Sequence, residues 1–527
     1  MGEVEKLLLE NNVTTLVSDI ILSQDLSVSQ VRQILKDQKY PLKSLDLDKI
    51  IDRIFMAKAK GEKVVIVGDY DADGIMATTI LVKALKEIGI DAGFYIPDRL
   101  KEGYGINTNI VSLVSERNYN LIITVDNGVV AYEALELAKS LNIDVIVTDH
   151  HNIDKQVNYK FDYILHPDYL SEGYNDLAGA GLALIIAERL LKGQGMADYY
   201  VYAMVATIAD MVSVFGHNRN IIKNGLYVLN NHGNKHIDSL IHYKNGVIDQ
   251  QVISFQVVPK LNTAGRLADR VNVNNLVRYF LIEDVVEIEK AAKSITAINQ
   301  DRITMTRSSF DNSNGIVKYG SLNIVIDSDI HEGITGLIAG RHMNKLNEPV
   351  LVLTKNDNLY KGSGRSPKGY DIFALIKPLE DLLESFGGHK QACGLSIDAA
   401  NLEIFLEEIS EASENIEVLE YSDPFISVDL KKLDLSAYHQ FSSLEPFGVD
   451  FIKPLLKVDV SAKAYPKILA EKYLKWEVSS NIEMISFDRN LDLDYYKTVK
   501  DISAYVDLSL NEFRGKKTIN LIIQEFI

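Results

Sequence analysis

The chain has 527 residues, 46% of them hydrophobic and 24% charged, and a formal net charge of −18. This length exceeds what one hydrophobic core usually serves, so about two to four domains are expected. The composition is typical of a soluble globular protein. The single cysteine, Cys393, excludes an intramolecular disulfide and any thiolate metal cluster.

No apolar run approaches the length of a membrane span. The first residues, Met1–Glu10, have no basic stretch before their apolar residues, so no secretory signal is predicted. We therefore expect a cytoplasmic protein without a membrane partner. The acidic net charge argues against nucleic acid as a partner, because polyanion binding usually leaves a basic footprint. Bound cations and a local basic groove would offset that argument.

Residues 1–60 are predicted to be helical, since Ser27 precedes apolar residues at helical spacing. In residues 61–272, strand-like apolar runs alternate with helical patterns, which predicts βαβ units and a parallel sheet. The carboxyl ends of the strands in such a sheet line one crevice. Residues that lie far apart in the sequence can therefore meet there.

Acidic residues and histidines recur at the ends of these apolar runs. The run that begins at Lys63 ends in three carboxylates, and the run that begins at Leu121 ends on one. The run that begins at Asp144 ends on an acid followed by two histidines, and a further acid closes the helix-like stretch 202–210. The residues concerned are Asp69, Asp71, Asp73, Asp126, Asp149, His150, His151 and Asp210.

Any one acid at a strand-to-helix junction is most simply explained as an N-cap. The recurrence of acids at several junctions, together with two adjacent histidines, is better explained as one site. Oxygen and imidazole ligands without sulfur favour Mn²⁺ or Mg²⁺ over structural zinc. A pair of such cations on one rim of a sheet is suited to phosphoester hydrolysis.

The second half of the chain changes character twice. Residues 273–312 are predicted to form a long amphipathic connecting helix, and residues 313–415 an α/β domain that opens with a strand at Leu322. Residues 420–527 contain short alternating strands, which predict a small β-barrel. Barrels that bind single strands combine basic and aromatic residues, here Lys457, Lys463, Lys467, Lys472, Lys475, Arg514, Lys516 and Lys517 with Tyr465, Tyr473, Trp476 and Phe513.

The motif Asp149-His150-His151 resembles the one after which the DHH phosphoesterase superfamily is named. Within that superfamily the chain resembles the RecJ family of single-strand-specific exonucleases. Similar motifs are Gly-Ala-Gly at 179–181, Ala-Thr-Ile-Ala-Asp at 206–210, Asn-Thr-Ala-Gly-Arg at 262–266, Gly-Ser-Gly-Arg-Ser at 362–366 and Phe-Gly-Gly-His-Lys at 386–390. The match extends from about residue 60 to the end, in the expected order.

The resemblance implies a domain organisation. A DHH domain would occupy residues 61–272, a DHHA1 domain residues 313–415 and a nucleic-acid-binding OB-fold residues 420–527. The expected fold class is thus α/β, with a parallel-sheet DHH domain joined by a long helix to an α/β DHHA1 domain, followed by a β-barrel. The N-terminal segment would pack onto the catalytic domain.

The resemblance also implies roles for the acidic cluster, with two divalent cations, Mn²⁺ or Mg²⁺, as cofactors. Asp71 would serve one cation and Asp73 the other, with Asp126 bridging them. His150 and Asp210 would complete the second site, and Asp69 would bind the first cation or orient its ligands. Asp149 would orient an imidazole through its second nitrogen, and His151 would face the scissile phosphate or orient a ligand.

Phosphate positioning is expected from other residues. Arg266, which closes a small-residue loop, would form a forked contact with a phosphate beside the metals; a surface ion pair is the alternative. In the glycine-rich stretches, bare backbone and side-chain donors would hold phosphates, although each stretch alone is more often a tight turn. The predicted substrate-binding residues are Asn262, His331, Arg341, Ser363, Arg365, Ser366, Gly387, Gly388 and His389.

The resemblance implies a 5′→3′ exonuclease on single-stranded DNA that releases mononucleotides in recombination and repair. RNA as a substrate is left open, and a helicase or a single-strand-binding protein is an expected partner. One alternative is a phosphodiesterase for short oligoribonucleotides or cyclic dinucleotides, which the barrel and the 262–266 segment disfavour. Another is a non-catalytic replication scaffold, which would have lost metal ligands that are all present in this sequence.

Overall fold

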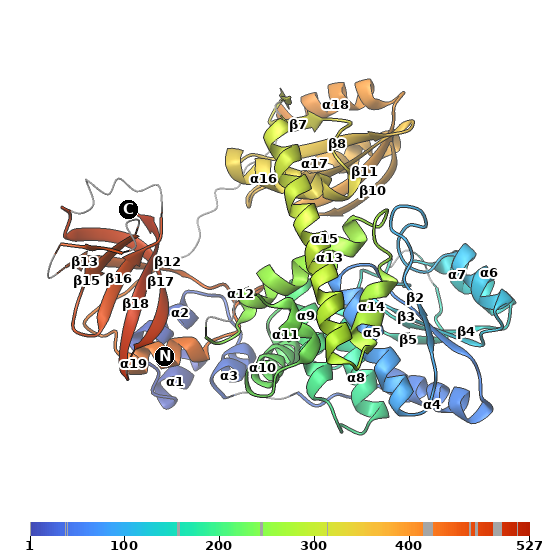
Figure 1. Cartoon of the computed structure of the whole chain (residues 1–527), viewed down its shortest axis with the longest axis horizontal. Helices are drawn as coiled ribbons and strands as arrows, with labels where there is room; N and C mark the ends of the chain where they lie inside the picture. The colour runs from blue at the N-terminus through green and yellow to red at the C-terminus, as the bar shows by residue number, and fades with distance from the viewer. Residues whose placement is uncertain are drawn as a thin grey trace.

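The computed structural model describes residues 2–527 apart from 37, 39, 155–156, 158, 243–245, 314, 415–424, 463–464, 470–472, 489–497 and 514. Three sheets organise the chain: a five-stranded, a six-stranded and a seven-stranded one. The long helix α15 (Val285–Asn312) joins the first two, and the third lies to one side (Figure 1). The predicted fold class is confirmed. None of the helices in the described residues combines the length and hydrophobicity needed to cross a bilayer.

The first sheet has the strand order β2-β1-β3-β4-β5, and all neighbouring strands are parallel. Its central strands are buried apolar runs, as expected where helices cover both faces of a sheet. The strands are β1 (Val64–Val67), β2 (Gly93–Tyr95), β3 (Leu121–Val125), β4 (Asp144–Thr148) and β5 (Tyr163–Leu165). Because they are parallel, the residues that follow β1, β3 and β4 meet at one edge.

Helices surround this sheet and complete the parallel-sheet domain. Two of them, α8 and α9, are buried on nearly all sides, in keeping with their almost uniformly apolar sequences. The helices are α4 (Leu45–Lys60), α5 (Ala72–Glu87), α6 (Thr108–Glu116), α7 (Tyr132–Ser140), α8 (Gly179–Leu190), α9 (Ala197–Ala209), α10 (Gly216–Asn231), α11 (Lys235–Leu240), α12 (Gln250–Val252), α13 (Val258–Arg266) and α14 (Asn274–Leu281). A short π-helix, η2 (Ile253–Val257), lies between α12 and α13.

Two local expectations are wrong. The small-residue segment ending at Arg266 is helix α13, not a loop, because Pro259 at its first turn and the apolar contacts of Leu261 favour a helix. Residues 273–312 form two helices, α14 and α15, instead of one. The break falls where Ile282 is extended and the Asp284 side chain caps the new helix by accepting from Glu287 N at 3.0 Å.

The second sheet belongs to an α/β domain with the strand order β10-β11-β9-β8-β7-β6. The strands are β6 (Ile316–Tyr319), β7 (Leu322–Ile326), β8 (Val350–Asn356), β9 (Leu359–Arg365), β10 (Leu383–His389) and β11 (Ala392–Asp398), and the helices are α16 (Thr335–Leu346), α17 (Ile372–Ile376) and α18 (Leu402–Glu414). The glycine-rich stretches predicted to hold phosphates lie on strands β9 and β10, so they are not tight turns.

The third sheet forms the barrel domain, with the order β12-β13-β17-β18-β16-β15-β14. Its elements are β12 (Phe425–Ser427), α19 (Leu435–Ser443), β13 (Leu455–Ser461), β14 (Lys467–Leu469), β15 (Tyr473–Glu477), β16 (Ile482–Ser486), β17 (Asp501–Phe513) and β18 (Lys516–Phe526). Trp476, one of the aromatics expected to stack on bases, is fully buried and donates to Val499 O. Tyr465 is 58% exposed beside Lys500. Lys463, Lys472, Arg514 and the Phe513 side chain lie outside the described residues.

The N-terminal helices depart from the expected arrangement. Helices α1 (Glu3–Glu10), α2 (Thr15–Leu22) and α3 (Val28–Lys36) share a hydrophobic core with the barrel domain and with Val214, Phe215 and Ile222 of the parallel-sheet domain, whereas α4 packs within the core of the parallel-sheet domain. Leu7, Ile20 and Ile21 are buried in the same cluster as Phe441 and Trp476. The expectation that the segment packs onto the catalytic domain holds for α4 and for the contact of Gln33 with Gly216, but most apolar partners of α1–α3 belong to the barrel domain.

The buried guanidinium of Arg219 joins α10 to the barrel domain. It donates to the carbonyl oxygens of Leu444, Glu445 and Pro446 at 2.7, 3.0 and 3.1 Å. Arg219→Ala should lower the free energy of unfolding of this junction by about 3 kcal/mol, because the carbonyls would lose a charged donor. Urea unfolding would measure the loss. Arg189→Ala, which removes a half-exposed surface ion pair with Asp48, should change it by less than about 1 kcal/mol; an equal effect of both variants would contradict the prediction.

Candidate active site

The segment after β1 carries the first carboxylates. The Asp71 side chain caps α5, accepting from Asp73 N at 2.9 Å and Gly74 N at 3.1 Å through one oxygen. A Cβ on Gly74 would lie 2.5 Å from Asp69 O, so only glycine permits this close turn. The turn leaves the second oxygen of Asp71 and the carboxylate of Asp69 at the edge of the sheet.

The Gly-Ala-Gly start of α8 supports the second part of the cluster. Asp73 is 1% exposed and accepts from Gly179 N at 2.6 Å and Ala180 N at 2.7 Å. Carboxylates are stabilised at helix N-termini, so this contact holds Asp73 in place. A Cβ on Gly179 would lie 2.7 Å from Asp126 Cβ, which explains why glycine is needed where α8 approaches the cluster.

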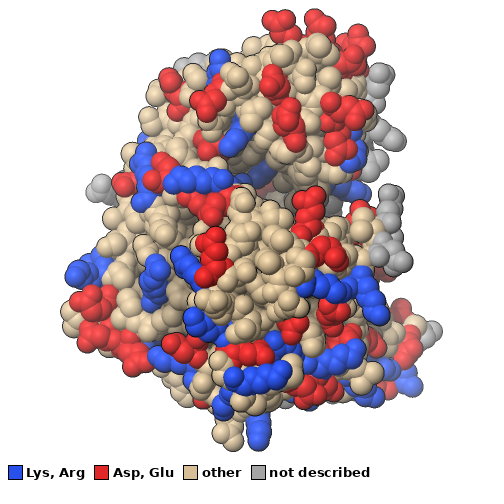
Figure 2. All heavy atoms as spheres, turned by 90° about the vertical axis from the view of Figure 1, so that its right-hand side faces the viewer, with Lys and Arg blue, Asp and Glu red and all other residues tan. Residues whose placement is uncertain are grey.

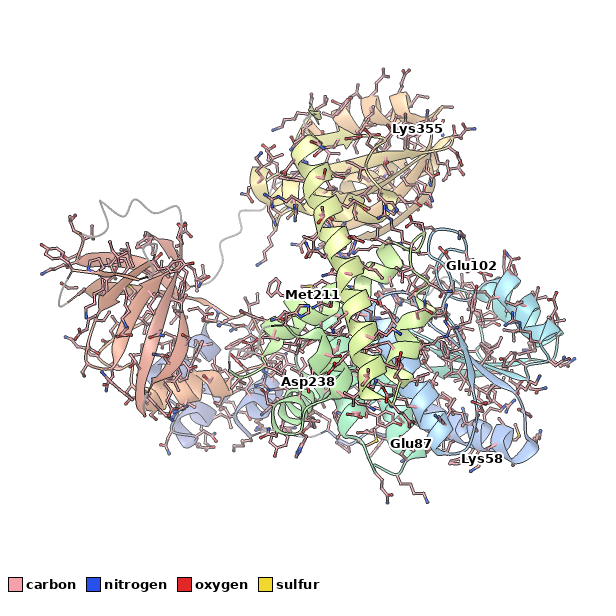
Figure 3. All side chains as sticks on the ribbon, viewed as in Figure 1. Lys58, Glu87, Glu102, Met211, Asp238 and Lys355 are labelled. Atoms are coloured by element: carbon pink, nitrogen blue, oxygen red, sulfur yellow. The ribbon has the colours of Figure 1, made fainter. Side chains whose placement is uncertain are left out.

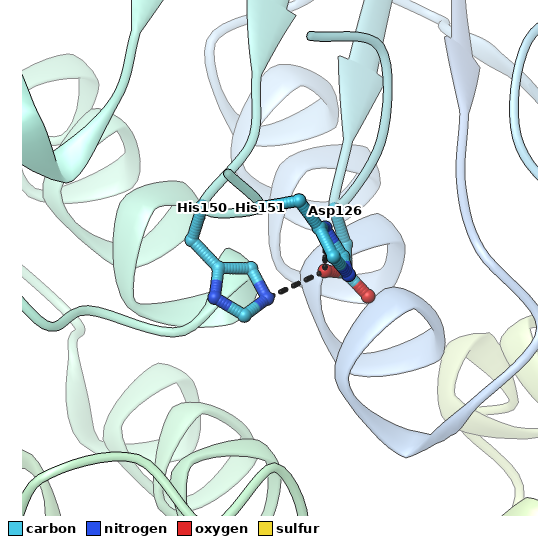
Figure 4. Close-up of side chains that lie close together, drawn as sticks. All are labelled: Asp126, His150 and His151. Atoms are coloured by element: carbon cyan, nitrogen blue, oxygen red, sulfur yellow. Dashed lines mark ion pairs between the residues drawn. The ribbon is translucent and has the colours of Figure 1, made fainter. Parts of the chain in front are cut away.

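Asp126 and His150 lie at the centre of the site (Figure 4). His150 Nε2 is 3.1 Å from Asp126 Oδ1, 3.5 Å from Asp210 Oδ2 and 3.7 Å from Asp73 Oδ2. Asp126 is 2% exposed and has a left-handed backbone conformation, with φ of 62°. Asp73 in the first turn of α5, Asp126 after β3 and Asp210 at the end of α9 thus converge on the imidazole that follows β4.

His151 is oriented from two sides. Its Nδ1 is 2.7 Å from Asp149 Oδ1, and the Tyr104 hydroxyl, which donates to Asp126 O at 2.7 Å, lies 3.1 Å from the same ring nitrogen. The carboxylate of Asp149 also accepts from the backbone N–H groups of His150 and Val129. This places Asp149 beside an imidazole, as the resemblance implies, with His151 at the margin of the cluster.

The cluster is electrostatically unfavourable without counter-ions. Burial and then the charge of Asp71 raise the pKa of Asp69. Burial, followed by repulsion from neighbouring carboxylates, also raises the pKa values of Asp73 and Asp126. Burial and Asp71 raise the pKa of Asp210 to about 7. The pKa of His150 is lowered to about 4, first by burial and then by the charge of His151.

The side chains fit divalent cations. Asp69, Asp71 and Asp126 place ligand atoms within 4.8 Å of one another, as do Asp73, His150 and Asp210. A third set joins Asp126 to both histidines, so Asp126 belongs to two sets. In the described residues, the buried atoms Asp69 Oδ1, Asp126 Oδ1 and His150 Nε2 have no hydrogen-bond partner. Buried polar atoms without partners are costly, and a cation of the Mn²⁺ or Mg²⁺ type would satisfy all three.

Adding Mn²⁺ to metal-free protein should raise its Tm, because a cation removes both the carboxylate repulsion and the unpaired buried atoms. A ligand present at a hundred times its Kd adds about 2.7 kcal/mol to the stability of the form that binds it. Differential scanning calorimetry with EDTA, Mn²⁺ and Mg²⁺ would measure the shift. Asp91→Asn, an exposed position outside the cluster, should keep the full shift. An unchanged wild-type Tm would show that the cluster holds no cation.

A groove of about 460 Å³ lies beside the cluster, between the parallel-sheet domain and the second α/β domain. Its walls are built by Tyr70, Arg99, Leu100, Gly103, Tyr104, Glu332, Gly333, Thr335, Lys361, Gly362, Ser363, Ser385, Gly394, Leu395 and Ser396. Predicted residue Ser363 faces it and is 3.1 Å from the Thr335 hydroxyl. The carboxylate of Glu332 neutralises Lys361 at 2.8 Å.

Arginines gather near this groove without acidic partners. The pKa of Arg266 is lowered to about 10, first by burial and then by the charges of Arg99, Arg302 and Arg365. Burial, and then the charge of Arg341, lowers the pKa of Arg302. Within the part of the chain that the structure describes, none of the five forms an ion pair with Asp or Glu. Such mutual repulsion is tolerated where an anion is bound.

The face shown in Figure 2 carries charges of both signs. On the face in Figure 2, acidic and basic side chains are intermixed, and Asp and Glu predominate at its top. The net charge of −18 therefore coexists with a local group of arginines, of which Arg99 lines the groove. We name the five side chains Arg99, Arg266, Arg302, Arg341 and Arg365 the arginine cluster.

Other predicted substrate residues are already engaged. Asn262 Oδ1 accepts from Ala72 N at 2.8 Å, which ties α13 to the start of α5. The Ser366 hydroxyl donates to the carbonyls of Tyr370 and Lys390. His331 Nε2 lies 3.2 Å from Asp269 Oδ1. These side chains support the groove from behind.

The remaining predicted substrate residues lie on the second α/β domain. Arg341 projects over the Phe310 ring at 5.8 Å. Gly387, Gly388 and His389 lie on the exposed edge strand β10. The structure brings none of these four into contact with the carboxylates.

Sequence reasoning missed four residues around the site: Tyr104, His166, Arg99 and Arg302. His166 Nε2 donates to His151 O at 2.8 Å, and its Nδ1 accepts from Asp168 N. His166 directly follows β5, so the strand-end rule applied to the other ligands could have found it. Arg302 lies in the middle of α15, where nothing in the local sequence distinguishes it from a surface arginine.

Comparisons with known proteins agree with this geometry. Residues 63–213 match the DHH family N-terminal domain, residues 312–415 the DHHA1 domain and residues 426–525 the RecJ OB domain. The single-stranded-DNA-specific exonuclease RecJ of Bacillus subtilis is 29% identical over 548 residues, covering 99% of this chain and 69% of the relative.

Two solved structures are similar along much of the chain. RecJ from Thermus thermophilus in complex with Mn²⁺ has a TM-score of 0.82 at 21% identity and covers 100% of this chain and 78% of its own. An exonuclease RecJ bound to manganese has a TM-score of 0.61 at 27% identity and covers 71% and 96%. Both contain the metal that the donor set of the cluster favours.

Proposed function

The chain belongs to the DHH superfamily, with the DHH, DHHA1 and OB domains of a RecJ exonuclease, and from this premise we propose that it degrades single-stranded DNA from the 5′ end to mononucleotides. It is a metal-dependent hydrolase of phosphodiester bonds. The RecJ relatives are named for single-stranded DNA, which supports the same substrate class here. A role in recombination and repair is part of the proposal.

One observation carries the proposal: two sets of metal ligands, linked by the 3.1 Å contact between Asp126 Oδ1 and His150 Nε2, lie beside a groove that Arg99 of the arginine cluster lines. Asp69 and Asp71 with Asp126 would hold one cation, and Asp73, His150 and Asp210 the other. Such a pair, when bound, supplies an activated water and neutralises charge on the leaving oxygen. Asp149 would keep His151 oriented toward the scissile phosphate.

The arginine cluster would position the strand. Arg266, on α13, and Arg365, on β9, lie close enough for their charges to repel, and a phosphate bound between them would relieve that repulsion. Ser363 and Thr335, the first residue of α16, would donate to the same phosphate. Gly364 lets this strand lie close to Cys393, because a Cβ at position 364 would be only 2.7 Å from Cys393 Sγ.

Digestion of end-labelled oligonucleotides would test the proposal. With Mn²⁺, a 5′-labelled single strand should release labelled mononucleotide from the first time point, whereas a 3′-labelled strand should shorten progressively. Parallel reactions with RNA, with duplex DNA and with EDTA define substrate class and metal dependence. Internal cuts, release from the 3′ end, or equal digestion of blunt duplex would contradict the proposal.

A helicase or a single-strand-binding protein would supply the unwound strand, because a groove that acts on single strands needs one separated from its complement. Stimulation of digestion on a duplex with a short 5′ tail, on adding a helicase, would support this partner class. The same addition should leave digestion of an already single-stranded oligonucleotide unchanged.

A further inference from the structure

Met211 has an unusual conformation and exposure. It directly follows Asp210, the C-cap of α9, and has a left-handed backbone with φ of 55°. This position after a helix is commonly glycine or asparagine, because a Cβ is disfavoured there. Its side chain is nevertheless 74% exposed, although methionine is among the residues most often buried. Backbone strain and an exposed apolar side chain coincide one residue after a predicted metal ligand.

A pocket of about 330 Å³ opens beside Met211. Most of its lining is apolar, including Ile208, Val212, Val258 and Val449, while Gln250 and Ser254 add polar groups. Apolar walls with a few polar groups are typical of sites for flat organic ligands.

The pocket is built by two domains together. Val214 N donates to Val449 O at 3.2 Å, and Gln250 Nε2 donates to Phe447 O at 3.2 Å, so the loop before β13 closes one wall. Met211 lies on the side of the parallel-sheet domain that faces the barrel (Figure 3). A strand that passes from the metal cluster toward the barrel would therefore cross this pocket.

We propose that Met211 and this pocket hold the nucleobase next to the scissile phosphate, on the side of the strand that remains after cleavage. This inference rests on the proposed function. The ligand class is any nucleobase, since apolar walls and a thioether contact the ring face and do not read its edge. A thioether contributes favourable contacts with aromatic rings. A base held here would fix the position of the phosphate beside the cation that Asp73, His150 and Asp210 would hold.

The left-handed backbone does not by itself explain why an apolar side chain is exposed at Met211, as a comparison with Lys192 shows. Lys192 occupies the corresponding position after α8, with φ of 54°, and is also exposed. There the side chain is the polar one expected at a surface. The exposed apolar side chain at Met211 is thus not a requirement of the left-handed turn.

Replacement of both residues by glycine separates the backbone from the side chain. Met211→Gly and Lys192→Gly should each leave Tm unchanged or raise it, because glycine adopts the left-handed conformation without strain. Met211→Gly alone should raise the KM for single-stranded DNA by about two- to tenfold, the range expected for loss of a thioether–ring contact. Met211→Leu should restore most of the affinity.

A strand with an abasic site next to the cleaved phosphate distinguishes base contact from ligand positioning. For the wild type, the KM on the abasic strand should exceed that on the intact strand by a similar factor. Met211→Gly should have the same KM on both strands. An Mn²⁺-induced Tm shift equal to that of the wild type would show that Asp210 is undisturbed.

Three results would overturn the inference. The first is a Met211→Gly variant with the same KM as Lys192→Gly. The second is a KM that Met211→Gly raises over the wild type by the same factor on intact and abasic strands, and the third is a smaller Mn²⁺-induced Tm shift in Met211→Gly than in the wild type. If the wild type does not digest the intact strand, the proposed function itself fails. The wild-type reaction on intact DNA thus separates the two failures.

Discussion

Asp126→Asn should reduce hydrolysis of single-stranded DNA by at least about a thousandfold, since a metal site supplies several kcal/mol of charge stabilisation and each 1.36 kcal/mol is tenfold in rate. Asp126 belongs to the same ligand set as Asp69 and Asp71, and its Oδ1 lies 3.1 Å from His150 Nε2 in the other set, so its loss should affect both cations. An amide can neither bridge two cations nor supply negative charge. Single-turnover digestion of labelled DNA with Mn²⁺ would measure the loss.

The same variant should be more stable than the wild type without metal. Burial and the charges of Asp73, Asp71, Asp69 and Asp210 raise the pKa of Asp126, so the ionised carboxylate opposes folding. Asparagine keeps the shape and tolerates the left-handed backbone at this position. The Tm in EDTA should therefore rise, and the Mn²⁺-induced shift should shrink. Asp91→Asn is the matched control, and wild-type turnover by Asp126→Asn would rule out the assignment of two cations.

The position of the carboxylates could be predicted because it depends on local pattern and on one rule of topology. Alternation of apolar runs and helices fixes a parallel sheet, and the carboxyl ends of its strands share an edge. Asp69, Asp126 and Asp149 follow β1, β3 and β4 within two residues and meet as that rule requires. His166 follows β5 in the same way, so the same rule places it at this edge of the sheet.

Other features depend on contacts between distant segments, which a local pattern does not contain. Helices α1–α3 are amphipathic in the sequence, but this periodicity does not identify the partner of their apolar faces. The partner is the barrel domain, more than four hundred residues away, to which Thr14 N donates a hydrogen bond at Gln440. Arg302 acquires its environment only when α15 lies against α13, where its Nε donates to Asn299 and Asn299 accepts from Thr263.

The shared core also changes how the barrel can be tested. Removing residues 420–527 would expose the apolar faces of α1–α3 and leave Arg219 without its carbonyl partners. Loss of activity in such a truncated chain would reflect unfolding as much as weaker binding. Single substitutions of exposed barrel residues, such as Tyr465, would change the binding of the strand without unfolding the shared core.

Arg266→Ala should lower kcat/KM on single-stranded DNA by about 10- to 150-fold, since a hydrogen bond to a charged group is worth about 1.5–3 kcal/mol. Its guanidinium is repelled by Arg99, Arg302 and Arg365 and has no acidic partner among the described residues. A bound phosphate is therefore the partner that its position favours. Arg266→Lys should recover only part of the activity, because an ammonium keeps the charge but loses the forked geometry.

Two further measurements distinguish phosphate binding by Arg266 from a structural role. The dependence of log KM on log salt should become shallower by about 0.7 in Arg266→Ala, the value for one phosphate contact on a single strand. Its Mn²⁺-induced Tm shift should equal that of the wild type, because the residue is not a metal ligand. Arg270→Ala is the matched control: Arg270 lies four residues further on, exposed and 3.7 Å from Asp269, and its loss should leave the salt slope unchanged. If Arg266→Ala and Arg270→Ala had the same kcat/KM and the same salt slope, Arg266 would serve only the fold, and the arginine cluster would have to hold the strand through Arg365 and its neighbours.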